Sequence, residues 1–347
     1  MIAAPLLEVD RVTMRFGGLV ANEDVSFQVN AGEIFAVIGP NGAGKTTLFN
    51  AISGVYQPTS GEVRFHGSVI RKPFTWSVAC RVIGASLGRG FGAMIVFNSI
   101  SLWTAAIVAN YVYREPFEWS KACAAIVPTL QDAGFAWTWL LAAIVAVVSG
   151  CGHWILWQRA RRAPDVVARA GIARTFQNIR LFGELSVLGN VLVGMDSKLR
   201  CGFFTNLLRL PAYRREHTQS EGCAMELLEF VGLRQHASEA ARNLSYGMQR
   251  RLEIARALAS QPQLLLLDEP AAGMNPTETV SLMELIRRIR QRGVTVLLIE
   301  HHMRVVMGVS DRICVLNFGK RIAQGTPDHI RNDPACIEAY LGKDEID

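Results

Sequence analysis

Residues 39–46 read Gly-Pro-Asn-Gly-Ala-Gly-Lys-Thr, which is the spacing G-x-x-x-x-G-K-[ST] of a phosphate-binding loop. An apolar run of strand type, Ile34–Ile38, precedes this stretch, and a run compatible with a helix begins at Thr46. The glycines allow a tight turn whose N–H groups point at phosphate oxygens, and the helix adds its positive end. We therefore predict a nucleotide site in which Lys45 binds the β- and γ-phosphates and the Thr46 hydroxyl reaches Mg²⁺. A glycine-rich turn without a ligand is the alternative, which the strand, the spacing and the Lys-Thr pair disfavour.

The composition fits a protein that handles nucleotides or lies against an anionic membrane surface. The chain has 347 residues, of which 50% are hydrophobic, and a net charge of +6. This modest basic excess suits phosphate or membrane partners, and the lack of a long basic run argues against nucleic acid. The seven cysteines are scattered without a C-x-x-C pair, so we expect neither a zinc site nor a disulfide framework. The first ten residues do not resemble a signal peptide.

Hydrophobic periodicity divides the chain into regions of different type. Residues 6–70 contain short runs with period two, such as Val25–Val29, and these predict an antiparallel β region. Helix-like runs, Gln249–Ala259 and Thr277–Arg290, alternate with apolar strand-like runs such as Leu264–Leu267 in the second half. Continuous apolar strands belong in a sheet that is covered on both faces. The pattern predicts an α/β nucleotide-binding core with an antiparallel β subdomain and a helical insertion.

Two long stretches in the middle of the chain, Gly90–Tyr113 and Ala133–Trp157, carry no charge. Each exceeds the ~20 residues that a helix needs to cross a bilayer. Basic residues flank the pair on both outer sides, as is typical of cytoplasmic ends, and both halves of the nucleotide site must lie in one compartment. We predict a transmembrane hairpin inserted in a cytosolic domain. The outer basic residues are Arg71, Lys72, Arg81, Arg89, Arg159, Arg161 and Arg162, and the loop between the stretches holds Arg114, Glu115, Glu118, Lys121 and Asp132.

A soluble helical hairpin, buried against another subunit, is the alternative for this insert. Small residues and several polar ones favour it, since polar groups inside a bilayer need partners. Gly84, Gly88 and Gly92 have the spacing of a close helix contact, but Arg89 lies among them, and we interpret this stretch as a flexible entry to the hairpin. The polar residues are Asn98, Ser99, Ser101, Asn110 and His153.

An apolar strand-like run ends in two acids, Asp268 and Glu269. Asp268 at the strand end can hold Mg²⁺, directly or through water, and Glu269 can polarise an attacking water. Adjacent acids with these two roles fit nucleotide hydrolysis, in which positioning and charge stabilisation do most of the catalysis. An acidic turn without a ligand is common by itself, but it is disfavoured when a phosphate-binding loop is present.

Residues 244–251, Leu-Ser-Tyr-Gly-Met-Gln-Arg-Arg, lead into a helix. A serine hydroxyl and a glycine backbone at a helix start form an anion site. Together with the phosphate loop and the two acids, this stretch resembles the signature of an ATP-binding cassette (ABC) ATPase. It departs from the commonest form, L-S-G-G-Q, at Tyr246 and Met248, while Ser245 and Gly247 remain. We interpret Arg250 and Arg251 as a pair on the helix surface.

Further stretches resemble the ATPases of branched-chain amino-acid importers. Residues 171–182 are similar to their Q-loop, residues 268–276 to their D-loop region with Asn275, and residues 325–342 to their C-terminal tail. Residues 299–303, Ile-Glu-His-His-Met, are similar to their switch-histidine segment I-E-H-D-M, with His302 in place of the Asp. The resemblance covers about 1–70 and 165–342, and ordinary members lack the insert.

The resemblance implies a P-loop NTPase fold with a RecA-like core, an antiparallel β subdomain and a helical subdomain, here with the hydrophobic hairpin inserted. It implies ATP and Mg²⁺ as ligands, with an aromatic residue, Phe16, stacked on adenine. The expected catalytic residues are Glu269, His301 and Gln177, and the expected metal ligands are Thr46, Gln177 and Asp268. The expected nucleotide-binding residues are Phe16, Gly39, Asn41, Gly42, Gly44, Lys45, Thr46, Thr47, Ser245 and Gly247.

The resemblance also implies partners at the cytoplasmic face of the inner membrane. Two cassettes face each other head to tail, and we expect the second to be a different chain. Each signature then closes the phosphate loop of the other cassette, and two permease subunits and a periplasmic substrate-binding protein complete an importer. A non-transport ABC ATPase with a regulatory role is the main alternative, although the chain has neither two cassettes nor long charged coiled coils. A half-transporter with its own permease would need more than two membrane helices.

We accordingly expect three segments. Residues 1–72 form the N-terminal part of the ATPase with the phosphate loop. Residues 73–163 form the inserted hairpin, with helices at about 90–113 and 133–157. Residues 164–347 form the C-terminal part, which carries the Q-loop, the signature, the two acids and the switch histidine.

Overall fold

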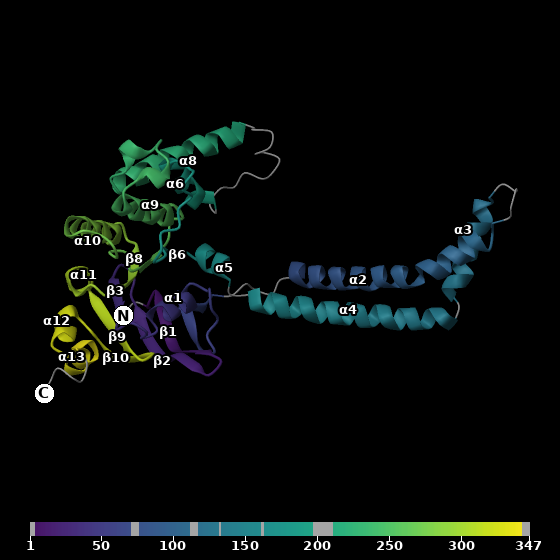
Figure 1. The fold of residues 1–347 in the computed structure, drawn as a ribbon, viewed down its shortest axis with the longest axis horizontal. Coiled ribbons are helices and arrows are strands. Elements are labelled where there is room, and N and C mark those ends of the chain that lie inside the picture. Colours follow the sequence, from purple (N-terminus) through teal and green to yellow (C-terminus); the bar gives the residue numbers. More distant parts are fainter. Residues whose placement is uncertain are drawn as a thin grey trace. The chain divides into compact units, whose positions relative to one another are not determined.

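The computed structural model describes residues 4–70, 76–111, 117–131, 133–160, 163–196 and 211–341. The chain divides into two compact units, whose elements are labelled in Figure 1. The first unit combines Met1–Arg71 with Arg162–Asp347, and the second comprises Lys72–Arg161. The first unit is therefore formed by the N-terminal and C-terminal parts of the sequence, and the second unit is inserted between them in the chain.

A four-stranded antiparallel sheet forms the N-terminal part of the first unit, in the order β2-β1-β4-β5. On β2, Val25, Phe27 and Val29 are buried while the residues between them are more exposed, which is the alternation expected of a half-buried strand. This sheet confirms the predicted antiparallel β subdomain. The strands are β1 (Leu7–Phe16), β2 (Leu19–Val29), β4 (Ser60–Phe65) and β5 (Ser68–Val69).

A six-stranded sheet forms the centre of the first unit, in the order β10-β9-β3-β8-β7-β6. All neighbouring pairs from β9 to β6 are parallel, and only β10 runs antiparallel to β9. The strands are β3 (Ile34–Ile38), β6 (Ile172–Arg174), β7 (Leu264–Asp268), β8 (Thr295–Ile299), β9 (Arg312–Asn317) and β10 (Lys320–Gly325).

The central strands are buried on both faces, which explains their unbroken apolar sequence. Successive residues of β3 belong to different cores: Ile34 and Ala36 to one, Phe35 to the other. The first core also contains residues of the helices, and the second contains residues of the antiparallel sheet and of α1, such as Phe49. The six-stranded sheet thus separates two hydrophobic cores, as parallel sheets usually do.

Helices cover the sheet and build a separate helical group. In the first unit α6, α8 and α9 pack against one another (Figure 1), while α10 packs against β8. The helices are α1 (Lys45–Ile52), α5 (Pro164–Arg169), α6 (Val187–Met195), α8 (Pro211–Phe230), α9 (Tyr246–Ala259), α10 (Pro276–Gln291), α11 (Met303–Val309), α12 (Pro327–Arg331) and α13 (Pro334–Leu341). Short 3₁₀ turns lie at Arg234–His236 and Ala241–Asn243.

The second unit is a helical hairpin. Its elements are α2 (Trp76–Trp103), a π-helical turn (Thr104–Val108), α3 (Trp119–Gln131) and α4 (Ala133–Ala160). Within this unit α2 and α4 lie side by side over much of their length (Figure 1). A Cβ on Gly90 would lie 2.7 Å from the carbonyl oxygen of Ala142 and 3.0 Å from the Cβ of Ala146. The absence of a side chain at Gly90 therefore permits the close approach of the two helices.

The first hairpin helix differs from the expected 90–113. It begins at Trp76, ends at Trp103 and runs through Gly84, Gly88 and Gly92, so this stretch is helical rather than a flexible entry. The charged residue Arg89 does not interrupt α2, because its side chain has partners on α4. It donates a hydrogen bond to Ser149 (2.8 Å) and contacts His153 Nδ1 (3.0 Å). Outside the described residues lie Arg71, Lys72, Arg114, Glu115, Asp132, Arg161, Arg162 and Gly342, together with the side chains of Asn98, Ser101 and Arg159.

Candidate functional site

The phosphate loop connects β3 to α1, and its glycines are needed for space as well as for conformation. Gly44 has φ +89, and a Cβ there would lie 2.3 Å from the carbonyl oxygen of Ala21. A Cβ on Gly39 would lie 2.1 Å from the carbonyl oxygen of Leu316. A side chain at either position would collide with backbone, so both positions require glycine. The loop is thereby pressed against β2 and β9.

Lys45 begins α1 and is 6% exposed. Its ammonium donates hydrogen bonds to the carbonyl oxygens of Gly39 (2.7 Å) and Pro40 (2.9 Å), inside the loop. Burial lowers the pKa of Lys45, and the carboxylates of Glu269 and Asp268 oppose this shift. The predicted phosphate-binding lysine therefore lies within the electrostatic reach of the two predicted acids.

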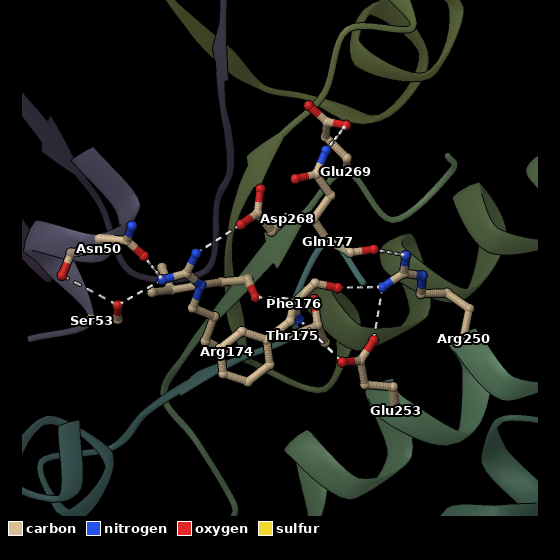
Figure 2. Close-up of polar contacts among 11 residues, drawn as sticks. Asn50, Ser53, Arg174, Thr175, Phe176, Gln177, Arg250, Glu253, Asp268 and Glu269 are labelled. Atoms are coloured by element: carbon tan, nitrogen blue, oxygen red, sulfur yellow. Dashed lines mark hydrogen bonds and ion pairs between the residues drawn. The ribbon is translucent and has the colours of Figure 1, made fainter. Parts of the chain in front are cut away.

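Asp268 ends β7 and is 1% exposed. Its Oδ2 accepts a hydrogen bond from Arg174 at 2.8 Å (Figure 2). Arg174 also donates to Asn50 Oδ1 (2.6 Å) and Ser53 Oγ (2.9 Å), at the C-terminal end of α1. Burial raises the pKa of the Asp268 carboxyl, and the hydrogen bond and charge of Arg174 lower it. Arg174 is thus the buried cation that compensates Asp268 and ties α1 to β7.

The second oxygen of Asp268 offers a test of metal binding. Among the described residues, Oδ1 of Asp268 is buried and has no hydrogen-bond partner. An unpartnered buried carboxylate oxygen is costly unless a donor or a cation satisfies it. Hard oxygen ligands are what Mg²⁺ takes, so the Asp268 carboxylate fits this ion. The Thr46 side chain is exposed on the first turn of α1.

Glu269, Gln177 and His301 come from three different segments and converge. The Gln177 amide donates to Glu269 Oε2 at 3.0 Å (Figure 2), and His301 Nδ1 lies 3.6 Å from the same oxygen. Glu269 has φ +46, an uncommon backbone conformation for a residue other than glycine, which costs energy and is found at functional sites. The structure therefore brings the three predicted catalytic residues together around one carboxylate.

Glu300, a buried carboxylate that was assigned no role from the sequence, precedes His301 in the chain. It is fully buried after β8 and accepts hydrogen bonds from the N–H groups of Ala271 (2.8 Å), His301 (3.2 Å) and His302 (3.4 Å). Burial raises the pKa of Glu300, and the backbone hydrogen bonds from Ala271 and His302 lower it. Glu300 fastens the turn that carries His301 to the turn that follows Glu269. An acid directly after an apolar strand was the available signal.

The signature residues lie at the start of α9. Ser245 is its N-cap, with the hydroxyl accepting from the N–H of Met248 at 3.4 Å. A Cβ on Gly247 would lie 2.5 Å from Glu278 Oε1 on α10, and Asn275 and Glu278 form a capping box there. In the described part of the chain, no hydrogen bond joins Ser245 or Gly247 to the phosphate loop. The structure does not bring these two residues together with Lys45.

The interpretation of Arg250 as a surface residue is wrong. Arg250 is fully buried, whereas Arg251 is partly exposed. Arg250 forms an ion pair at 2.8 Å with Glu253, three residues along the same helix. Consecutive helical residues point about 100° apart, so the two neighbours face different environments. The i,i+3 spacing offered Glu253 as a partner for Arg250, but the two carbonyl oxygens that Arg250 also bonds lie 73 and 74 positions away and could not be read from the sequence.

The remaining predicted nucleotide-binding residues are exposed or partly exposed. Phe16 at the end of β1 is 43% exposed and contacts Tyr56 edge to face, with ring centroids 5.3 Å apart. Asn41 and Gly42 are exposed and Thr47 is partly exposed.

Two protein-family profiles match the chain. The profile described as ABC transporter matches residues 22–91 and 138–272. The profile described as branched-chain amino acid ATP-binding cassette transporter matches residues 320–346. Residues 92–137, within the hairpin, lie between the two segments matched by the first profile.

Relatives match the chain over almost its whole length. The high-affinity branched-chain amino acid transport ATP-binding protein LivG of Salmonella typhimurium is 37% identical over 99% of this chain and 100% of LivG. BraF of Pseudomonas aeruginosa, with the same description, is 36% identical over 99% and 100%. A crystal structure of a nucleotide-free ATP-binding cassette from an ABC transporter is 23% identical, with a TM-score of 0.63 and coverage of 98% of this chain and 100% of that chain.

We predict that Arg174→Met destabilises the first unit by about 3–5 kcal/mol, because it leaves the buried Asp268 carboxylate without its cation. Arg174→Lys should cost less, since the charge remains, but one ammonium cannot reproduce the fork that spans Asn50, Ser53 and Asp268. Urea unfolding of the purified protein measures both.

The matched control is Arg169→Met at the exposed end of α5, which should stay within about 0.5 kcal/mol of wild type. Equal unfolding free energies for Arg174→Met and Arg169→Met would contradict the compensating role of Arg174.

Proposed function

The chain belongs to the ABC transporter family of ATP-binding proteins, and we propose that it drives an importer of branched-chain or related amino acids. Its identity of 36–37% with LivG and BraF over the full length of each carries this proposal. The C-terminal match to the branched-chain cassette profile supports it independently. As a family member, the chain is an ATP-hydrolysing transporter subunit that works with membrane permeases.

Each predicted site residue has a place in the proposed hydrolysis. Lys45 exchanges its bonds to the loop carbonyls for the β- and γ-phosphate oxygens, and the glycine-rich loop presents its N–H groups. Glu269 accepts a proton from the attacking water. Gln177 and His301, which both face the Glu269 carboxylate, orient that water and the γ-phosphate. Phe16 supports the adenine by stacking on its ring.

Mg²⁺ is the expected cofactor, and it would neutralise the charge that develops on the β- and γ-phosphates. Thr46, Gln177 and Asp268 are the residues that would hold it, and the unpartnered Oδ1 of Asp268 supports this assignment. Because Asp268 is engaged by Arg174 through its other oxygen, its orientation is fixed before the metal binds.

We further propose a head-to-tail pair of cassettes, the second being a different chain. Ser245 and Gly247 at the start of α9 would then close the phosphate loop of the partner, and the Asn41–Thr47 stretch of this chain would receive the partner's signature. The exposure of Ser245 at a helix N-terminus, where anions bind readily, supports this arrangement. Two permease subunits and a periplasmic substrate-binding protein at the inner membrane complete the proposed complex.

The hairpin is proposed to cross the membrane twice. By length and composition alone, Val78–Val96 on α2 and Thr138–Trp157 on α4 could span a bilayer. Only 17% and 6% of these windows are buried, so most of their surface is available to lipid. The α2–α4 contact uses small residues, as membrane helices do. Arg81 and Arg89 both lie inside Val78–Val96 and are the main cost, which Ser149 and His153 reduce for Arg89.

We predict that Glu269→Gln lowers ATP turnover of the purified complex by ~10²–10⁴, the loss typical of removing a general base. ATP affinity should stay close to wild type, since Lys45 and its loop are unchanged. The variant should also accumulate as an ATP-bound pair of cassettes, which sedimentation detects. Glu284→Gln on the exposed face of α10 serves as control and should hydrolyse ATP normally. Near-normal turnover by Glu269→Gln would refute the assignment of the base.

We predict that a single cysteine at Ser120, on α3, lies outside the cytoplasm. In a chain whose other cysteines are replaced, an impermeant thiol reagent should label this site on intact spheroplasts. A cysteine at Gln291, exposed at the end of α10, is the matched control and should be labelled only after lysis. If the Ser120 site is also labelled only after lysis, the hairpin is an interfacial element inside the cell.

A further inference from the structure

The Q-loop main chain is held by a buried ion pair on the signature helix. Arg250 donates to the carbonyl oxygens of Phe176 (2.6 Å) and Gln177 (2.7 Å), as Figure 2 shows. Glu253 accepts from the N–H of Phe176 at 3.1 Å and pairs with Arg250 at 2.8 Å. Three main-chain groups of two consecutive residues are thus bonded to two side chains of α9.

The burial of this pair is informative, because buried ion pairs are expensive. The side chains of Arg250 and Glu253 are 0% and 1% exposed. Desolvating two such charges can outweigh their attraction, and apolar residues of similar volume are often equally stable in their place. What an apolar pair cannot do is donate to and accept from a neighbouring backbone. The distinguishing property of the pair is therefore the position that it imposes on residues 176 and 177.

This position matters for the reaction, because the side chain of Gln177 reaches the proposed base. Its amide donates to Glu269 Oε2 at 3.0 Å, while the residue itself is exposed. An exposed side chain has many rotamers, so its backbone must be fixed if the amide is to meet one oxygen. Catalytic groups displaced by about 1 Å can lose 10²-fold in rate.

The same pair connects Gln177 to the start of α9. Arg250 lies in the second turn after the N-cap Ser245, and its guanidinium lies 3.3 Å from the hydroxyl of Tyr246 and over that ring. A tilt or shift at the first turn of α9 would therefore act on the two backbone carbonyls of the Q-loop through the fully buried side chain of Arg250.

We propose that Arg250 and Glu253 are positioning residues for Gln177, and that through them the state of the signature helix sets the geometry at Glu269. The proposal rests on the proposed function, in which Ser245 and Gly247 serve the partner's nucleotide while Gln177 serves this chain's own. It assigns to the ion pair a role in coupling the two nucleotide sites. Tyr246, one of the two departures from the commonest signature, contributes its hydroxyl to this link.

The test replaces both charges at once, so that neither is left buried and unpaired. Arg250→Met with Glu253→Leu keeps the volume and removes the bonds to the Q-loop. In the purified complex, we expect kcat to fall roughly 10–100-fold. The KM for ATP and the affinity for a fluorescent ATP analogue should stay within about twofold. Arg251→Met, on the same helix and one residue away, is the matched control and should leave kcat and KM unchanged.

A double-mutant cycle distinguishes positioning from general damage. If the pair acts through Gln177, then adding the Met/Leu change to Gln177→Ala should lower kcat by less than about twofold further. Equal losses with and without Gln177, or wild-type turnover in the Met/Leu variant, would overturn the proposal. If the Met/Leu variant fails to fold by circular dichroism, Arg250→Lys carries the same cycle, because its ammonium keeps the charge beside Glu253 but cannot reproduce the fork that reaches both Q-loop carbonyl oxygens. Absence of turnover in the wild-type complex would instead refute the proposed function.

Discussion

The arrangement of the site depends on one interaction, the buried ion pair between Asp268 and Arg174. A carboxylate that is 1% exposed at the end of a central strand must be compensated, or it would be protonated or destabilise the fold. Arg174 provides the charge and, with its remaining donors, reaches Asn50 and Ser53 on α1. The strand with the acids and the helix of the phosphate loop are therefore held in register by the same side chain.

The three residues that follow Arg174 are also held by hydrogen bonds. Thr175 continues toward β7 by bonding to Leu266, and Phe176 and Gln177 are held by the ion pair on α9. Residues 174–177 thus connect β7 to α9, with Arg174 bonded to Asp268 at one end and Arg250 of α9 bonded to Phe176 and Gln177 at the other (Figure 2). Glu300 has a comparable role at the end of β8. It accepts hydrogen bonds from the N–H groups of Ala271, His301 and His302, and these bonds fix the turn from which the His301 side chain projects.

The sequence predicted those features that follow from local pattern. Motif spacing and hydrophobicity were sufficient to predict the phosphate loop and the strand before Asp268. The alternation of apolar residues with period two was sufficient to predict the β subdomain. Arg174, Arg250 and Glu300 could not be assigned from the sequence, because their roles depend on which strands and helices are neighbours. The first hairpin helix began at Trp76 rather than near Gly90, since a charge-free run marks apolar length and not the ends of a helix. Arg89 is accommodated inside that helix by partners on α4.

The two adjacent acids have different proposed roles: Asp268 holds the metal ion, and Glu269 accepts a proton from the attacking water. The most direct measurement is the affinity for ATP of the purified complex, with and without Mg²⁺, in Asp268→Asn and Glu269→Gln. We expect Asp268→Asn to lose most of the increase in affinity that Mg²⁺ gives, and Glu269→Gln to retain it. A wild-type response to Mg²⁺ in Asp268→Asn, or its loss in Glu269→Gln, would contradict this division.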